Sequence, residues 1–489
     1  SSHRDLLDTR TQPAIDAGVD TYIYTTGWGF GIGLHDSQVG SILKTTDGHL
    51  SRNQVGVFTA NGTDCLRITA DYVRSLGREF FWGMRMNDTH DAGYGNVFMP
   101  ENQFKADHPE VMFGPGSKHG AVTAVDYAEA RVRDFAVRYI MDVVDRYDVD
   151  GIFLDFYRHP VFFRSNSAGL PATDSERSAM NSFMRDLKRE LDRRRLADGR
   201  YYLVSVRVPD SVEYCRAIGL DIEAWLDESL ADILSTASYL QFNDWEYTAR
   251  LAHRYGVPAY SSLDESRVRN EGARHKRNCV RGYYGRVMNA WDAGCDGILM
   301  FNNSGLRDVG DSIEQNWFGK HAGSYREALS ATARGRDFVN TLSKTYFVSV
   351  RGVGGVAGGS LPHQEYIRIP TLSHQAPVSI SAGARTEVLI RIADDIGAAG
   401  NNGRTPTAAV SMSVASDPRA LAVSLNHTSL DIQDSTPMDT DPPKEGTDYL
   451  VSALIPVDVL RTGENVFALE ATEDMALLDL WVDVDYPLD

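Results

Sequence analysis

The chain has 489 residues, more than a single hydrophobic core usually serves, so its length favours two domains. Hydrophobic residues make up 42% and charged residues 24%, which is typical of a globular protein and not of a disordered chain. The formal net charge of -18, with no offsetting basic stripe, disfavours nucleic acid as a partner. No apolar run approaches the roughly 18 residues of a membrane helix, and the four cysteines have no metal-like or paired spacing.

Strand-like and amphipathic helical segments alternate from the start of the chain to about residue 310. The expected strands are 20–25, 79–86, 151–156, 201–208, 239–242, 259–263 and 297–301. The clearest helices between them are 64–76, 126–147 and 176–196. Thr123 with Asp126, and Thr173 with Glu176, have the spacing of capping boxes at two helix starts. This alternation is typical of a parallel sheet.

Seven strands over about 300 residues favour an α/β fold of the TIM (β/α)8 type, whose usual length is about 250 residues. The eighth strand is expected either upstream of the first residue or within the Gly-rich segment 27–62. A doubly wound open sheet is the alternative, because periodicity does not reveal whether a sheet closes.

After a last helix near 325–342 the pattern changes to short alternating strands broken by Gly, Pro, Asn and Asp. The expected strands here are 345–350, 365–369, 387–392, 408–414 and 477–485. We therefore predict a (β/α)8-like catalytic barrel over 1–343 and an accessory C-terminal β-sandwich over 344–489.

The most informative stretch runs from Val149 to Pro160 and reads Val-Asp-Gly-Ile-Phe-Leu-Asp-Phe-Tyr-Arg-His-Pro. It places Asp155 at the end of a buried strand, where a carboxylate is tolerated only near water or beside a partner. That position is the catalytic end of a barrel strand. The alternative is structural: Asp155 caps the strand or pairs with Arg158.

Polar and aromatic residues also follow the other expected strands, and in a barrel these ends converge on one face. Paired carboxylates with aromatic and amide side chains suit glycosidic bond cleavage, which needs an acid and a second carboxylate. The candidate catalytic residues are Asp155, Glu265, Asp264 and Asp244. The candidate substrate-binding residues are Trp28, Trp82, Arg85, Asn87, Asp88, His90, Tyr157, Arg158, His159, Arg207, Asn243, Glu246 and Asn302.

Four segments together resemble the glycosyl-hydrolase-like family 10 group of bacterial TIM-barrel proteins. They are 81–91 (Phe-Trp-Gly-Met-Arg-Met-Asn-Asp-Thr-His-Asp), 107–110 (Asp-His-Pro-Glu), 147–160 and 206–209 (Val-Arg-Val-Pro). The resemblance covers about residues 1–310. It implies a secreted or periplasmic carbohydrate-active enzyme whose catalytic Asp at the end of the fourth strand falls on Asp155. It leaves the acid/base carboxylate open among Asp210, Asp244, Glu246, Asp264 and Glu265.

The sequence thus predicts a glycoside hydrolase that cleaves a neutral or anionic poly- or oligosaccharide by a two-carboxylate, retaining mechanism without a metal or other cofactor. Asp155 is expected to be the nucleophile or charge stabiliser, with Glu265 or Asp264 as acid/base. Nucleic acid and membrane partners are not expected. One alternative is a carbohydrate-binding protein without activity. Another is a metal-dependent hydrolase centred on Asn87, Asp88, His90 and Asp91.

Overall fold

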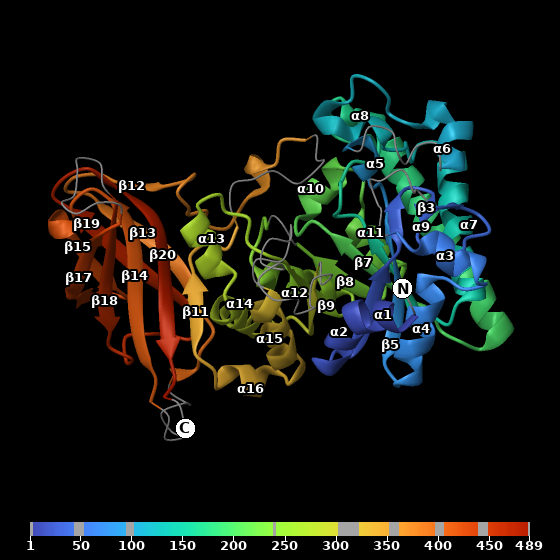
Figure 1. Ribbon diagram of the computed structural model, residues 1–489. Coiled ribbons are helices and arrows are strands. Elements are labelled where there is room, and N and C mark those ends of the chain that lie inside the picture. The colour runs from blue at the N-terminus through green and yellow to red at the C-terminus, as the bar shows by residue number, and fades with distance from the viewer. Residues whose placement is uncertain are drawn as a thin grey trace. The chain divides into compact units, whose positions relative to one another are not determined.

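The computed structural model describes residues 3–43, 53–93, 102–237, 241–301, 322–351, 361–396, 405–438 and 448–487 (Figure 1). The chain divides into two compact units, and each is described by itself. The first contains Ser1–Asn243, Tyr247–Ser262 and Gly355–Ile367, and the second contains Asp244–Glu246, Leu263–Gly354 and Arg368–Asp489. This division differs from the predicted boundary after residue 343, which stays a prediction.

A parallel sheet forms the centre of the first unit (Figure 1). Its strands, in spatial order, are β1 (Thr21–Thr25), β5 (Glu79–Arg85), β6 (Gly151–Asp155), β7 (Leu203–Val208), β8 (Ile233–Thr236) and β9 (Ala259–Leu263). The seventh strand, β10 (Gly297–Met300), belongs to the second unit, where the Phe301 amide donates to the Leu263 carbonyl at 2.8 Å. Chain order and spatial order agree. After each strand the chain therefore passes back through helical segments and adds the next parallel strand beside the last one, as in a (β/α)8-type fold.

The helical segments of the first unit lie before β1 and in the connections between these strands. They are α1 (His3–Leu6), a π-helical turn (Leu7–Thr11), α2 (Gln12–Asp16), α3 (Val55–Ala60), α4 (Cys65–Ser75), α5 (His90–Gly93), α6 (Gln103–Asp107), α7 (Ala130–Arg146), α8 (Arg164–Ser167), α9 (Asp174–Asp198), α10 (Val212–Ala217) and α11 (Ile222–Asp227). Helix α12 (Trp245–Arg254) follows β8. Short 3-10 turns occupy Pro109–Val111 and Lys118–Thr123. No described helix is long and apolar enough to cross a membrane.

Two helix starts test the predicted capping boxes. The one at α9 is confirmed: the Thr173 hydroxyl accepts from the Glu176 amide while the Glu176 carboxylate accepts from the Thr173 amide. The one at α7 is wrong, because that helix begins at Ala130 without a side-chain cap and the Thr123 hydroxyl donates to Asp91 instead. The apolar face of α7 is as predicted, with Val132, Phe135 and its helical neighbours buried.

The second unit combines helices with two antiparallel sheets. The helices are α13 (Glu271–Arg277), α14 (Val280–Asp292), α15 (Ala322–Ala333) and α16 (Arg336–Asn340). One sheet has the order β11 (Lys344–Phe347), β20 (Met475–Asp485), β14 (Thr407–Ala415), β18 (Asp448–Ile455) and β17 (Ile432–Pro437), with β12 (Val378–Ile380) also paired to β20. The other has the order β13 (Arg385–Ile392), β19 (Gly463–Ala471), β15 (Leu421–Leu425) and β16 (Thr428–Leu430).

The parallel βα alternation followed by antiparallel sheets confirms the predicted fold class. Two predicted strands are wrong. In place of the strand expected at 239–242, the strand after β7 is β8; residues 241–242 are not strand, and 239–240 lie outside the described residues. The strand expected at 365–369 begins with a 3-10 turn, Gln364–Tyr366. In the described part of the Gly-rich segment, β2 (Gly27–Gly29) and β3 (Ile32–Gly33), together with β4 (Ser41–Ile42), form a separate small sheet and not a barrel strand.

Candidate active site

Three charged residues stand at one level across neighbouring strands of the first unit. Arg85 on β5 is the register partner of Asp155 on β6, and Asp155 is the register partner of Arg207 on β7. In-register residues of adjacent parallel strands point to the same face of the sheet. The sheet therefore places Asp155 between two arginine residues, one on each neighbouring strand, at the carboxyl ends of its strands.

Asp155 is held by donors on both of its oxygens. Arg207 approaches as a fork, with Nε 3.0 Å from Oδ1 and Nη2 2.8 Å from Oδ2, and the loop amides of Tyr157 and Arg158 donate to Oδ1 at 3.1 and 3.0 Å. The residue is 1% exposed and Arg207 is fully buried. The ionic partner is thus Arg207 and not Arg158, which contributes its backbone amide. Such a bidentate pair fixes both the position and the orientation of the carboxylate.

Asp88, in the loop after β5, is a second buried carboxylate with several donors. Arg85 Nη1 donates to Oδ2 at 2.8 Å, and Oδ1 accepts from the His90 amide at 2.8 Å and from His90 Nδ1 at 2.5 Å. Burial alone would raise the pKa of Asp88, but the Arg85 guanidinium and the neighbouring imidazoles outweigh it and hold the pKa well below its usual range. Asp88 is therefore ionised at neutral pH, and its carboxylate accepts hydrogen bonds from Arg85 and His90.

His159 adopts a left-handed backbone conformation, with φ of 55°, directly before Pro160. A bulky side chain rarely takes this conformation, so the surrounding contacts must maintain it. The Thr89 amide donates to His159 Nδ1 at 2.9 Å, which fixes the ring against the loop after β5. Burial lowers the pKa of the His159 imidazole, although nearby Asp88 opposes this effect, so the ring is neutral at neutral pH.

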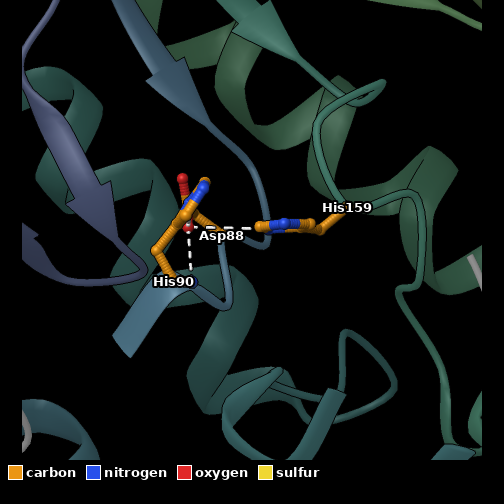
Figure 2. Close-up of side chains that lie close together, drawn as sticks. All are labelled: Asp88, His90 and His159. Carbon is orange, nitrogen blue, oxygen red and sulfur yellow. Dashed lines mark hydrogen bonds and ion pairs between the residues drawn. The ribbon is translucent and has the colours of Figure 1, made fainter. Parts of the chain in front are cut away.

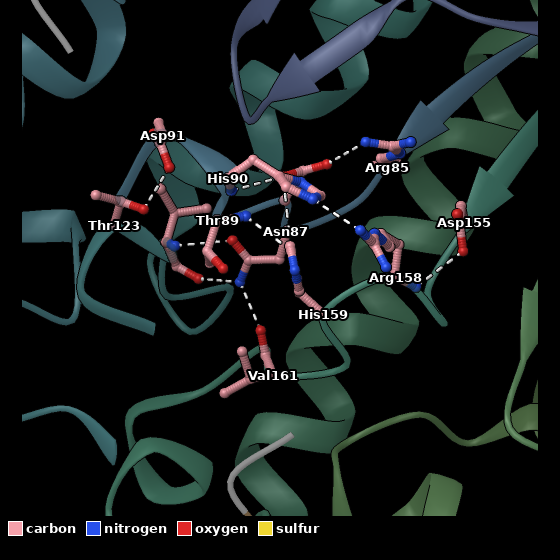
Figure 3. A network of polar contacts seen from close by, with 12 residues as sticks. Arg85, Asn87, Thr89, His90, Asp91, Thr123, Asp155, Arg158, His159 and Val161 are labelled. Atoms are coloured by element: carbon pink, nitrogen blue, oxygen red, sulfur yellow. Dashed lines mark hydrogen bonds and ion pairs between the residues drawn. The ribbon is translucent and has the colours of Figure 1, made fainter. Parts of the chain in front are cut away.

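Several hydrogen bonds join the loops that follow β5 and β6 (Figure 3). Arg158 Nη2 donates to His90 Nε2 at 2.7 Å, and the Asn87 amide group donates to the carbonyls of Val125 and Val161 at 2.8 and 2.7 Å. Asn87 Oδ1 accepts from the Val125 amide in return. Asn87 is thus fully engaged in holding backbone, and the loop that follows Asp155 is anchored at Arg158, His159 and Val161.

Among the described residues, Asp88, His90 and His159 form a group that could hold a metal ion (Figure 2), since their ligand atoms lie within 4.8 Å of one another. A carboxylate with two imidazoles suits a borderline cation such as Zn²⁺. Each imidazole must offer a lone pair, however, and these are already used. Thr89 donates to His159 Nδ1 and Arg158 donates to His90 Nε2, so these two nitrogens accept and the other nitrogen of each ring carries the hydrogen. The contacts therefore describe a hydrogen-bonded network.

Other predicted residues of the first unit are held by contacts within the protein. Trp82 is fully buried, its indole N–H donates to Thr26 at 2.7 Å and its ring packs on His35 and Tyr139, so no face remains for a sugar. Tyr157 is buried with its ring 5.4 Å below the Arg207 guanidinium. Asn243 donates to the Asp210 carbonyl, and the Asp210 carboxylate accepts from the amides of Phe242 and Asn243.

Some predicted residues cannot be assigned a contact. Trp28 lies in β2, and its side chain is outside the description; Asn302 lies outside the described residues. Asp91, considered for a metal, instead pairs with Lys105 at 2.7 Å, and both are buried. The structure therefore brings together Arg85, Asp88, His90, Asp155, Arg158, His159 and Arg207. Sequence reasoning missed Thr89, because a backbone amide leaves no residue-type signal.

The candidate acid/base residues lie in the second unit, at the end of β9 and before α12. Asp264 is buried, and its carboxylate accepts from the Glu265 amide at 2.8 Å. Arg267 Nε lies 3.3 Å from Glu265 Oε1, and Arg267 Nη2 lies 3.7 Å from Asp264 Oδ2. Burial, together with the Asp264 charge, raises the pKa of Glu265 to about 7, against the opposing effect of Arg267. Asp244 is exposed, and Glu246 forms an ion pair with Arg391.

Comparison with known proteins gives structural matches at low identity. No protein-family profile matches the chain, and no curated protein matches it. A cycloisomaltooligosaccharide glucanotransferase from Paenibacillus sp. has a TM-score of 0.35 at 11% identity over 98% of this chain, which spans 55% of that enzyme. A maltogenic alpha-amylase from Thermotoga neapolitana has a TM-score of 0.36 at 11% identity, and the match covers 97% of this chain and 92% of that one. An alpha-fucosidase from Thermotoga maritima has a TM-score of 0.33 at 12% identity, and the match covers 96% of this chain and 78% of that one.

Proposed function

We propose that this protein is a glycoside hydrolase that cleaves a poly- or oligosaccharide, with Asp155 as nucleophile or charge stabiliser. The observation that carries the proposal is the environment of Asp155 at the carboxyl end of β6. Among the described residues, three donors face Oδ1 and one faces Oδ2. Oδ2 therefore keeps a lone pair for a reacting carbon, while the Arg207 fork holds the group still.

A fixed carboxylate is what an oxocarbenium-like transition state requires. Positive charge develops at the anomeric carbon as the glycosidic bond breaks, and a carboxylate already in place needs no reorganisation to stabilise it. A carboxylate that attacks the same carbon gives a covalent intermediate and retention of configuration. We propose retention, because Asp155 is short and held by the backbone of its own loop, which suits direct attack.

We propose Glu265 as the acid/base group. A general acid must be protonated before the bond breaks and deprotonated afterwards, so a pKa near the working pH is the most useful. The pKa of about 7 that burial and Asp264 give Glu265 has this property. Asp264 then has the supporting role of the neighbouring charge that raises it.

The test is a screen of the wild-type chain against neutral and sulfated polysaccharides, followed by the variants Asp155→Asn and Glu265→Gln on the best substrate. Both should reduce kcat by several orders of magnitude. Matched controls are Asp142→Asn, a buried carboxylate that accepts from Ser37 and Gln38, and Glu271→Gln, a surface residue. The anomer released first, read by proton NMR, checks retention. Near-normal turnover of Asp155→Asn would refute the role of Asp155.

A carbohydrate-binding protein without activity is the second candidate. It is favoured by the 1% exposure of Asp155, which leaves little surface for a substrate. In that case polysaccharide binds to the wild-type chain, measured by affinity electrophoresis, and no reducing ends appear. We also propose secretion or export to the periplasm, as the sequence resemblance implies; fractionation of the native host is the check.

A further inference from the structure

The Asp88 carboxylate lies between two groups of donors that require different oxygens. Arg85 donates to Oδ2, while the amide and the Nδ1 of His90 donate to Oδ1. A carboxylate can accept on both sides. An Asn in its place has one oxygen and one NH₂ group, so one side would face donor against donor. The position therefore requires Asp by hydrogen-bond chemistry and not by shape.

This requirement determines the tautomer of His90. Its Nδ1 lies 2.5 Å from Asp88 Oδ1 and its Nε2 lies 2.7 Å from Arg158 Nη2 (Figure 2, Figure 3). A guanidinium only donates, so Nε2 must accept and Nδ1 must carry the hydrogen. The second loop histidine has the opposite arrangement, since the Thr89 amide donates to His159 Nδ1 at 2.9 Å. The two rings are thus held in different tautomers within one network.

The chain of contacts ends at the candidate nucleophile. Arg158 donates to His90 through its guanidinium and to Asp155 Oδ1 through its backbone amide at 3.0 Å. A shift of Arg158 would therefore disturb one of the donors that orient Asp155. His159, the next residue, has a left-handed backbone, and its ring accepts a hydrogen bond from the Thr89 amide.

We propose that Asp88 and His90 are positioning residues: Asp88 holds His90 as the Nδ1–H tautomer, so that His90 Nε2 accepts from Arg158 and fixes the loop that carries the amides on Asp155. The kinetic consequence of this positioning rests on the glycoside hydrolase activity proposed above, whereas the tautomer of His90 does not depend on that activity. Neither residue is assigned contact with the reacting atoms.

The first experiment reads the tautomers directly, without substrate. Histidine-selective ¹⁵N labelling and NMR, with His90→Gln and His159→Gln for assignment, should show His90 protonated at Nδ1 and His159 at Nε2. Asp88→Asn should change the His90 pattern or release it to a mixture, whereas the control Asp142→Asn should not. A His90 protonated at Nε2 in the wild-type chain would overturn the proposal, as would an unchanged His90 in folded Asp88→Asn.

His90 variants test the same idea if Asp88→Asn does not fold, because the His90 side chain is 26% exposed and tolerates change better. His90→Gln can still offer an oxygen to Arg158, whereas His90→Phe keeps the ring and removes both bonds. We expect His90→Phe to lower kcat about 10- to 100-fold with KM within about threefold, the usual effect of losing an orienting partner, and His90→Gln to recover part of the loss. Equal activity of His90→Phe and wild type would refute the positioning role.

The two proposals fail in different ways. If no polysaccharide is cleaved, the proposed function fails, and the NMR result still decides the tautomer. If cleavage is normal in folded Asp88→Asn and His90→Phe, the hydrolase assignment survives and the positioning role fails. Added Zn²⁺ is a further arm: a site-specific change in the ¹⁵N chemical shifts of His90 and His159 that saturates at one equivalent would show a metal centre and overturn the network.

Discussion

Replacing Asp155 by Asn tests whether the buried pair with Arg207 is essential to the first unit. Both side chains are at most 2% exposed and joined at 2.8 Å, with a second contact at 3.0 Å. Removing one member of a buried pair leaves the other charge uncompensated and typically costs about 3–5 kcal/mol. We therefore expect Asp155→Asn to lower the free energy of unfolding by about that amount, in addition to its effect on activity.

The assay is urea denaturation followed by fluorescence, with the double variant Asp155→Asn/Arg207→Gln completing a thermodynamic cycle. The double variant removes both charges, so it should be more stable than Asp155→Asn alone and remain inactive. The exposed pair Arg185–Glu228, at 2.6 Å, is the matched control: Glu228→Gln should cost at most about 1 kcal/mol. A loss below about 1 kcal/mol for Asp155→Asn, or a double variant less stable than the single one, would refute the reasoning.

Three further predictions concern other groups. Glu265 with a pKa of about 7 should give an activity that falls as the pH rises through 7, because a general acid must be protonated, and Glu265→Gln should remove that limb of the kcat/KM profile. Burial lowers the pKa of His35 from 6.5 to about 4, so as the pH falls the unfolded chain takes up the proton at a higher pH than the folded chain does. The free energy of unfolding should therefore fall by about 3 kcal/mol between pH 6.5 and 4. His35→Gln should flatten that change in urea titrations. Arg277 pairs with Asp479 through two 2.6 Å contacts in the core of the second unit, so Arg277→Met should destabilise the antiparallel sheets by about 3–5 kcal/mol in calorimetry, while Arg385→Met at an exposed pair should not.

The pattern of apolar residues was sufficient for the elements that position the site. The helical spacing of Val132, Phe135 and their neighbours predicted the buried face of α7, and the run before Asp155 predicted β6 and its polar end. Strand β8 was missed because Ile233–Thr236 is short and half polar, whereas 239–242 has the more apolar composition. Length and hydrophobicity locate a strand only when no stronger apolar run lies nearby.

The partner of Asp155 was not predictable for a different reason. Arg158 is three residues away and was the natural candidate, but a side chain leaving a parallel strand meets its in-register neighbours first. Arg207 is 52 residues away, and its register with Asp155 depends on the pairing of β6 with β7, which periodicity cannot give. Candidate residues could therefore be named from strand ends, but not the pairs they form.

Two ion pairs and two imidazole hydrogen bonds hold the loops that follow β5 and β6. Each carboxylate of the network faces an Arg at the carboxyl end of a strand: Asp155 pairs with Arg207 of the neighbouring β7, and Asp88 pairs with Arg85 at the end of β5, the strand that precedes its own loop. The imidazoles of His90 and His159 orient the loops through hydrogen bonds of 2.7 Å with Arg158 and 2.9 Å with Thr89. Such networks strengthen when every donor and acceptor is matched and weaken together when one is lost. Substitutions at Asp88, His90 and Arg158 should accordingly be strongly non-additive, and that coupling would separate a preorganised site from a set of independent surface contacts.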